Sequence, residues 1–321
     1  MSDGAAEGRE AIGLDVGGTK IAAVRIRPDG EILAREELPT PAEDMEATLG
    51  SMIEAAKAVR TDAVAVLGIG AAGLVQKGTG VLTFAPNLAW RDVPITERVG
   101  GALGLPTITD NDANVAAWGE LRFGAGRGHR DLLLITIGTG IGGGIVSDGR
   151  LFRGAHGFAA EIGHFIVEPG GPLCGCGNHG CWEQVASGHA IARGGRAAVL
   201  EHPTSAIASL AHGDPANVNG QLVTEAAQAG DPIAEGIFAV VGRRLGEGIA
   251  GLVNILDPEI VVVGGGAIAA GELLLGPARA AFVESVEAPD HRPAVAIVAA
   301  QLGNGAGAVG AAALALEELT A

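Results

Sequence analysis

Two apolar segments of this chain are each interrupted by a glycine-rich turn, and they lie about 120 residues apart. Residues 11–26 are typical of a strand, a turn at Gly17-Gly18 and a second strand, and residues 132–146 repeat this plan around Gly138-Thr139-Gly140. Residues 30–38 and 149–152 can add a third strand to each. The repeat predicts two related domains that face one another, with both glycine turns at one cleft.

Helices and apolar strands are expected to alternate along the rest of the chain. Helical patterns cover 42–60, 95–103, 114–123, 187–200, 224–228, 232–254 and 308–319, and apolar strands cover 63–69, 107–108 and 259–263. This alternation predicts an α/β architecture. We expect a small N-terminal domain, 1–113, against which the C-terminal helix 303–321 packs back, and a large domain, 114–302.

All three cysteines of the protein lie in one short segment. His164 is followed by Cys174, Cys176 and Cys181, with glycines between them. One histidine and three cysteines supply the four ligands of a closed tetrahedral zinc site, and the glycines allow a short loop to fold around the metal. The alternative is three free thiols, because an odd number of cysteines leaves one unpaired in any disulfide scheme. His179 lies inside the same loop and competes with His164 for the fourth position.

Composition excludes several classes of protein. A hydrophobic fraction of 48% with 53 glycines argues against disorder, and the net charge of −16 opposes binding to nucleic acid. The polar, acidic N-terminus does not resemble a signal peptide, and glycines interrupt the apolar runs well short of a membrane span. We therefore expect a soluble, cytoplasmic protein without a membrane partner, in a compartment where thiolates can hold zinc.

Two segments, 68–73 and 138–143, match the dinucleotide pattern G-x-G-x-x-G. Neither is followed by a helix start, which that motif requires, and no P-loop motif occurs. Glycine turns can still bind phosphate through their backbone amides, and Thr19 and Thr139 add hydroxyl donors. One such turn alone would be an ordinary hairpin, whereas two matched turns favour a nucleotide.

Several motifs together resemble the ROK family of sugar kinases. They are Asp15-Val-Gly-Gly-Thr-Lys20, Asn111-Asp112-Ala-Asn114, 137–144, Glu161-Ile-Gly-His164 and the Cys-x-Cys-Gly-x-x-Gly-Cys-x-Glu183 pattern. The cysteine motif is most similar to that of zinc-containing, actinobacterial-type glucokinases. The resemblance implies a two-domain actin-like ATPase (ribonuclease H-like) fold with an interdomain cleft, and ATP-dependent phosphorylation of glucose to glucose 6-phosphate. It implies structural zinc and magnesium with ATP, and we also expect a homo-oligomer, a dimer or tetramer.

The resemblance makes Asp112 the general base. A sugar hydroxyl that attacks the γ-phosphate must lose its proton, and a nearby carboxylate can accept it. From the residues alone, Asp112 is equally well explained as a helix N-cap.

The remaining site residues also follow from the resemblance. The sugar hydroxyls would be held by Asn87, Asn111, Asp112, Glu161, His164 and Glu183, although Asn87 after Pro86 also suits a turn. Asp15 would lie near magnesium through water. The phosphates and adenosine would lie near Gly17, Gly18, Thr19, Lys20, Gly138, Thr139, Gly140, Gly264, Gly265 and Gly266.

The chain departs from the family pattern at Ala160, where many members have glycine. Ala72 likewise stands where a proline is frequent, and both changes bear only on sugar selectivity. A kinase for fructose, mannose or an N-acetylhexosamine, or one that uses polyphosphate, fits the same motifs. A sugar-sensing transcriptional repressor of the family carries a winged helix of roughly 70 residues before the first turn, whereas fourteen residues precede Asp15 here, which makes DNA binding unexpected.

Overall fold

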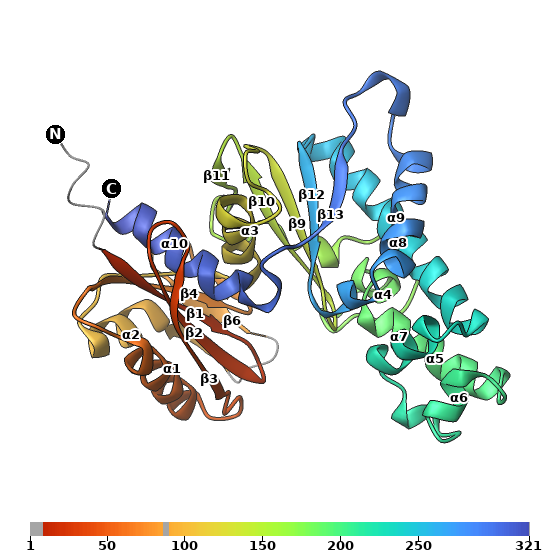
Figure 1. The fold of residues 1–321 in the computed structure, drawn as a ribbon, viewed down its shortest axis with the longest axis horizontal. Coiled ribbons are helices and arrows are strands. Elements are labelled where there is room, and N and C mark those ends of the chain that lie inside the picture. Colours follow the sequence, from red (N-terminus) through yellow and green to blue (C-terminus); the bar gives the residue numbers. More distant parts are fainter. Residues whose placement is uncertain (1–8, 86–89, 321) are drawn as a thin grey trace. The chain divides into compact units, whose positions relative to one another are not determined.

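The computed structural model describes residues 9–85 and 90–320 (Figure 1). The chain forms two compact units, and each contains stretches that are far apart in the sequence. Unit 1 comprises 1–134, 144–160 and 300–321, and unit 2 comprises 135–143 and 161–299. These bounds differ from the predicted 1–113 and 114–302 because the helix after residue 111 packs against the C-terminal helix and stays with the N-terminal sheet.

Unit 1 is built on a five-stranded sheet of order β3-β2-β1-β4-β8. Its strands are β1 (Glu10–Val16), β2 (Lys20–Ile26), β3 (Ile32–Pro39), β4 (Val64–Ala71) and β8 (Thr107–Asn111). The first three are antiparallel neighbours, whereas β1, β4 and β8 run parallel. The carboxyl ends of β1, β4 and β8 therefore meet at one edge of the sheet, where α/β proteins commonly bind ligands.

Helices cover both faces of this sheet (Figure 1). Helices α1 (Met45–Val59) and α2 (Ile95–Leu103) pack with Ile12, Leu14 and other apolar strand residues in a buried core. On the other face α10 (Ala306–Thr320) lies directly against the strands. Gly13 and Gly68 are partners across β1 and β4, and a Cβ on either would lie 1.8 Å from a carbonyl oxygen of α10. Glycine is needed here because the helix backbone touches the sheet.

Unit 1 also contains α3 (Asp112–Phe123), which packs on α10, and a small sheet of order β5-β6-β7. The strands of this small sheet are β5 (Leu74–Val75), β6 (Val81–Phe84) and β7 (Arg91–Pro94).

A second five-stranded sheet has the order β11-β10-β9-β12-β13. Its strands are β9 (Leu132–Ile137), β10 (Ile141–Ser147), β11 (Arg150–Leu151), β12 (Ile260–Gly264) and β13 (Ala296–Ala299), and β9 and β10 contribute residues to both units. If the strands are matched in chain order, this sheet has the same order as the first. The repeated strand plan predicted from the two glycine turns is therefore confirmed.

Unit 2 is otherwise mostly helical. Its helices are α4 (Glu183–Ala186), α5 (Gly188–Glu201), α6 (Ala206–Leu210), α7 (Gly220–Gln228), α8 (Pro232–Leu256) and α9 (Glu272–Ser285). Helix α8 begins at an Asp231 N-cap followed by Pro232, a common helix start. None of the helices in the described part of the chain combines the length and apolarity that a membrane crossing needs.

Candidate active site and metal centre

The first glycine turn lies at the carboxyl end of β1, in unit 1. The backbone nitrogen of Gly17 donates to the Lys20 carbonyl at 3.0 Å, which closes the turn. Asp15 precedes the turn and packs against the start of α10, where a Cβ at Gly307 would lie 2.5 Å from Asp15 Oδ2. The exposed Lys20 ammonium pairs with Glu37 at 2.8 Å. The turn therefore carries a carboxylate held close to a helix start.

Asn111 and Asp112 lie at the junction of β8 and α3, at the same edge of the sheet as Asp15. Asn111, rather than Asp112, is the N-cap of α3: its Oδ1 accepts from the backbone nitrogens of Ala113 at 2.8 Å and Asn114 at 3.2 Å. Asp112 is the first residue of the helix itself. The alternative that Asp112 serves as the helix N-cap is therefore wrong.

Both carboxyl groups hold their protons more tightly than usual. Burial, with repulsion from Asp112, raises the pKa of Asp15 to about 7, and Lys20 opposes this only partly. Burial also raises the pKa of Asp112. Two acidic groups with raised pKa values at one sheet edge suit proton transfer or the binding of a cation.

The predicted cysteine loop forms a compact cluster in unit 2. One ligand atom from each of His164, Cys174, Cys176 and Cys181 lies within 4.8 Å of the others. Cys176 Sγ and Cys181 Sγ are 3.6 Å apart, as are Cys174 Sγ and His164 Nδ1. A tetrahedral zinc with Zn–S bonds of about 2.3 Å places its sulfurs about 3.8 Å apart. The cluster therefore fits a structural zinc ion in ligand type and spacing.

His179 lies outside this cluster. Its Nδ1 is 2.9 Å from the carbonyl oxygen of Gly171, and it is exposed. Trp182, next to the ligand Cys181, is fully buried and donates to the Arg244 carbonyl of α8 at 2.9 Å. The loop is thus anchored to the long helix of unit 2, and His164 is the histidine that the fold brings to the cysteines.

Glu183 connects the cluster with the second glycine turn. Its Oε1 lies 3.0 Å from Cys174 Sγ and 3.9 Å from His164 Nδ1, and its Oε2 lies 3.4 Å from the backbone nitrogen of Ile141. Glu161 is exposed at the start of the short 3-10 turn that ends at His164. Both predicted sugar-binding glutamates therefore lie beside the metal cluster.

The second glycine turn is held by the start of α5. Ser187 Oγ donates to the Thr139 carbonyl at 2.9 Å, and the backbone nitrogens of Gly188 and His189 bind the carbonyls of Gly138 and Thr139. Gly265, with φ of 86°, lies so close to β9 that a Cβ would be 2.5 Å from the Ile137 carbonyl oxygen. The structure thus brings Gly138–Gly140 and Gly264–Gly266 together within unit 2.

The predicted site residues fall into two groups. Unit 1 contains Asp15, Gly17–Lys20, Asn111 and Asp112. Unit 2 contains Gly138–Gly140, Glu161, the metal ligands, Glu183 and Gly264–Gly266. Asn87 lies outside the described residues. That the two groups share one cleft remains a prediction.

Two buried carboxylates were not predicted, Asp110 shortly before α3 and Glu120 within it. Asp110 is 5% exposed and pairs with Arg153, and the carboxylate of Glu120, which is 0% exposed, accepts from the backbone nitrogens of Ala125, Gln301 and Leu302. Asp110 is adjacent to the Asn111-Asp112 motif, which was the available signal. Glu120 carries no signal in the sequence, since it looks like any charged helix residue.

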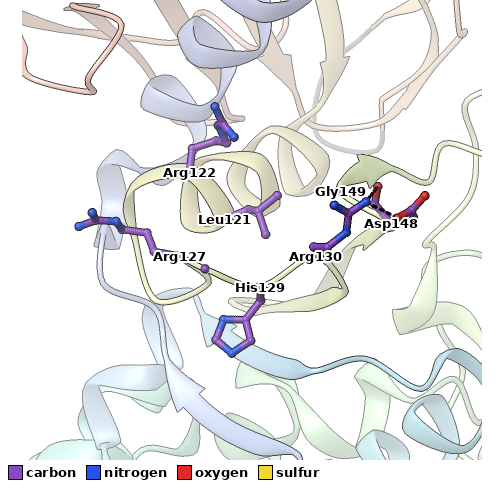
Figure 2. Close-up of a pocket in the computed structure, with 8 residues that line it drawn as sticks. Leu121, Arg122, Arg127, His129, Arg130, Asp148 and Gly149 are labelled. Atoms are coloured by element: carbon purple, nitrogen blue, oxygen red, sulfur yellow. Dashed lines mark hydrogen bonds and ion pairs between the residues drawn. The ribbon is translucent and has the colours of Figure 1, made fainter.

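A hollow of about 480 Å³ is lined by the end of α3, by residues 127–130 between α3 and β9, and by Asp148 and Gly149. Figure 2 shows that Arg122, Arg127 and His129 point in different directions. Arg122 pairs with Glu317 at 2.7 Å, and Arg130 pairs with Asp148. Because these side chains do not converge, and Arg122 and Arg130 already have acidic partners, we assign this hollow no ligand.

Comparison with known proteins decides the family. A model of the ROK family matches residues 11–318. The chain belongs to the ROK family. A glucokinase of Streptomyces coelicolor is 45% identical over 310 residues, which are 95% of this chain and 97% of the relative.

Solved structures that resemble this chain also belong to the ROK family. The crystal structure of a ROK family glucokinase from Streptomyces griseus in complex with glucose and AMPPNP is 43% identical, with a TM-score of 0.87, over 96% of this chain and 99% of that one. The predicted α/β, actin-like ATPase fold class is confirmed. A xylose repressor of Caldicellulosiruptor bescii is 34% identical over 84% of this chain but only 68% of its own length. The family thus contains regulators as well as kinases.

Proposed function

We propose that this ROK protein is a glucokinase that transfers the γ-phosphoryl group of ATP to the 6-hydroxyl of glucose. The observation that carries this proposal is the nearly full-length likeness to glucokinases, one of them in complex with glucose and AMPPNP. A repressor is less well supported, because the relative named as a xylose repressor is 34% identical to this chain, against 45% for the glucokinase of Streptomyces coelicolor. The net charge of −16 also opposes nucleic-acid binding.

Asp112 is the proposed general base. It is the first residue of α3, with Asn111 as the helix cap, and burial raises its pKa, which improves its match to a base at neutral pH. As the 6-hydroxyl oxygen attacks the γ-phosphorus, its proton passes to an Asp112 carboxylate oxygen, and ADP leaves. The rest of catalysis is positioning and charge stabilisation.

The other groups position the two substrates. We assign the sugar hydroxyls to Asn87, Asn111, Asp112, Glu161, His164 and Glu183, and the nucleotide to Gly17, Gly18, Thr19, Lys20, Gly138, Thr139, Gly140, Gly264, Gly265 and Gly266. Asp15 would hold Mg²⁺ through water, and Mg²⁺ would supply positive charge against the phosphate oxygens. The proposal requires both units to face one cleft, since each supplies part of this set.

Zinc in the Cys3His cluster would be structural. All four positions of a tetrahedral ion are taken by protein ligands, so no position is open for substrate. The cluster would fix the loop that carries Glu161 and Glu183.

Substrate profiling tests the function. Purified protein with Mg²⁺ should phosphorylate glucose with ATP, measured by coupled detection of glucose 6-phosphate. Fructose, mannose, N-acetylmannosamine and N-acetylglucosamine should be poorer acceptors, and polyphosphate should be tried as donor in parallel. A higher kcat/KM for one of the other sugars would reassign the substrate, and no sugar phosphorylation with tight binding to a DNA library would favour a regulator.

We also propose that the protein is a cytoplasmic homo-oligomer, a dimer or a tetramer. The apolar side chains Val240, Ile255 and Val283 of α8 and α9 are more than half exposed in the single chain. Light scattering during size-exclusion chromatography measures the oligomeric state directly, and a monomer at micromolar concentration would contradict the proposal.

A further inference from the structure

A buried ion pair lies directly behind the proposed catalytic segment. The side chain of Asp110 is 7% exposed and that of Arg153 is 16% exposed, and Arg153 Nε donates to Asp110 Oδ2. Arg153 follows β11 in the sequence, and its Nη2 also donates to Glu318 Oε1 of α10 at 2.7 Å. All three residues belong to unit 1. Arg153 thus joins the strand end before Asp112 to the last turn of the C-terminal helix.

The second oxygen of Asp110 binds Asn111, directly before Asp112, and Asn114, two residues after it. Asp110 Oδ1 accepts from the backbone nitrogen of Asn111 at 2.8 Å and from Asn114 Nδ2 at 2.9 Å. Asn111 Nδ2 in turn donates to the Gly73 carbonyl at 3.1 Å. Asp112 is therefore held between two residues that are both fixed by one buried carboxylate.

Stability alone is a weak reason for such a pair. Removing two charges from water costs free energy that their attraction only partly offsets, and apolar residues of similar size often stabilise a fold as well. What a satisfied buried network adds is a defined geometry. Here that geometry is imposed on the start of α3, where the proposed general base lies.

We propose that Arg153 is a positioning residue for phosphoryl transfer, which acts through Asp110 to set the place of the Asp112 carboxylate. Glu318 fixes the guanidinium from the other side, so the C-terminal helix contributes to the site without touching substrate. This inference rests on the proposed function, in which Asp112 is the base.

A cavity beside the ion pair makes the idea testable by chemical rescue. It has a volume of about 300 Å³ and is lined by Arg153, Asp110 and Glu318, together with Lys77 and several threonines. Truncation of Arg153 to alanine would extend this cavity up to the Asp110 carboxylate. Guanidinium ion is small enough to enter and to donate to the same oxygen.

The experiment compares Arg153→Ala, Arg153→Lys and Asp112→Asn in the full chain. Displacement of a catalytic group by about 1 Å can cost about 100-fold in rate, so we expect Arg153→Ala to lower kcat 10- to 100-fold while the KM for ATP stays within about 2-fold. Millimolar guanidinium chloride should restore part of the lost kcat. Arg153→Lys should be intermediate, because lysine keeps the charge but lacks the planar fork that binds two acids at once.

Arg98→Ala is the matched control. Arg98 also lies in unit 1 and forms a two-bonded ion pair, with Glu46, but both side chains are exposed. Its kcat should remain normal, with no response to guanidinium. If guanidinium restores kcat in Arg153→Ala and has no effect on Arg98→Ala, the loss in Arg153→Ala is a positioning effect and not a general loss of folded protein.

The outcomes separate the two proposals. Normal kcat in Arg153→Ala, with Asp112→Asn inactive, would overturn the positioning role and leave the base assignment intact. A loss of kcat that guanidinium does not restore, accompanied by a lower melting temperature and equal loss in Arg153→Lys, would also overturn it, because the pair would then be merely structural. An active Asp112→Asn variant would instead overturn the assignment of the base on which the inference rests.

Discussion

Glu183 Oε2 lies 3.4 Å from the backbone nitrogen of Ile141, in the strand that leaves the second glycine turn. The other oxygen of the same carboxylate lies 3.0 Å from Cys174 Sγ. One side chain therefore spans the distance from the metal cluster to a proposed phosphate turn. Gly140 makes this approach possible, since a Cβ there would lie 2.3 Å from Glu183 Oε2.

This relationship predicts how loss of zinc affects ligand binding. Cys176→Ser should lose the metal and weaken glucose binding by at least about 10-fold, because the loop that orients Glu161 and Glu183 is no longer fixed. ATP binding should weaken less, through the Ile141 contact alone. Zinc content by elemental analysis, and glucose and nucleotide affinities by titration calorimetry, measure these effects.

His179→Ala is the control for that experiment. His179 lies in the same loop but binds the Gly171 carbonyl instead of the cluster, so one zinc per chain should remain. Zinc lost from His179→Ala and kept in His164→Ala would reverse the ligand assignment.

Asp112→Asn should keep glucose binding and lose turnover. The amide has the shape of the carboxylate but cannot accept the hydroxyl proton, and a positioned base contributes about 10²–10⁴-fold in rate. Single-turnover kinetics with calorimetric measurement of glucose affinity would check both parts. Near-normal turnover would remove Asp112 from the mechanism.

Local patterns were enough to predict most of the fold. The two strand-turn-strand segments depend on alternating apolar residues and on glycines, which act over a few residues. No helix is predicted over Glu272–Ser285, and Gly276-Pro277 inside this segment is a signal typical of a break. The structure accommodates Pro277 within α9 against Gly242 of α8, where a Cβ would lie 2.6 Å from the Leu274 carbonyl oxygen and 3.0 Å from Pro277 Cβ. Tertiary packing thus overrides a local signal.

The site was predicted where its residues form short motifs and missed where they do not. The cysteine loop and Asn111-Asp112 are contiguous in sequence. Arg153 instead contacts Asp110, which is 43 residues away in the sequence, and Glu318, which is 165 residues away. No short sequence motif can therefore contain this network. The choice between His164 and His179 likewise required the fold, because both satisfy the ligand spacing.

Asp15 should make the protein less stable as the pH rises. Its pKa is about 7 in the folded chain against 3.8 for an ordinary aspartate, so the folded state binds more protons between these values, and the free energy of unfolding falls from about pH 4 to pH 7. Asp15→Asn removes this contribution. One pKa unit corresponds to about 1.4 kcal/mol. We therefore expect the free energy of unfolding of the variant, taken relative to wild type, to be higher at pH 8 than at pH 5 by at least about 1 kcal/mol.

Urea unfolding at both pH values, without Mg²⁺ and without a chelator that would remove zinc, measures this difference. Added Mg²⁺ should stabilise wild type more than the variant at pH 8. An equal stability difference at the two pH values would contradict the raised pKa.

Ala160→Gly should stabilise the protein. Ala160 has φ of 69°, a left-handed conformation that costs an L-residue roughly 1–2 kcal/mol. Glycine removes that strain but loses about 0.5–1 kcal/mol more conformational entropy on folding, so the net gain should be about 0.5–1 kcal/mol. Urea unfolding measures this gain. Ala159→Gly is the control, because φ of Ala159 is not positive, and that variant should not be stabilised.

Gly307→Ala should impair catalysis without unfolding the protein. A Cβ at this position would lie 2.5 Å from Asp15 Oδ2 and 2.6 Å from its Cγ, so the carboxylate must move away from the start of α10. Alanine favours a helix by about 1 kcal/mol over glycine, which offsets part of the strain, and the melting temperature should change little. If Asp15 places Mg²⁺ as proposed, its displacement should lower kcat about 10- to 100-fold and raise the Mg²⁺ concentration required for half-maximal rate.

Gly305→Ala provides the matched control, because a Cβ at Gly305 would meet no atom within 4 Å. That variant should show wild-type kcat and Mg²⁺ dependence. Equal kinetics for Gly307→Ala and Gly305→Ala would mean that the position of the Asp15 carboxylate does not limit the reaction, and the magnesium role proposed for Asp15 would have to be abandoned.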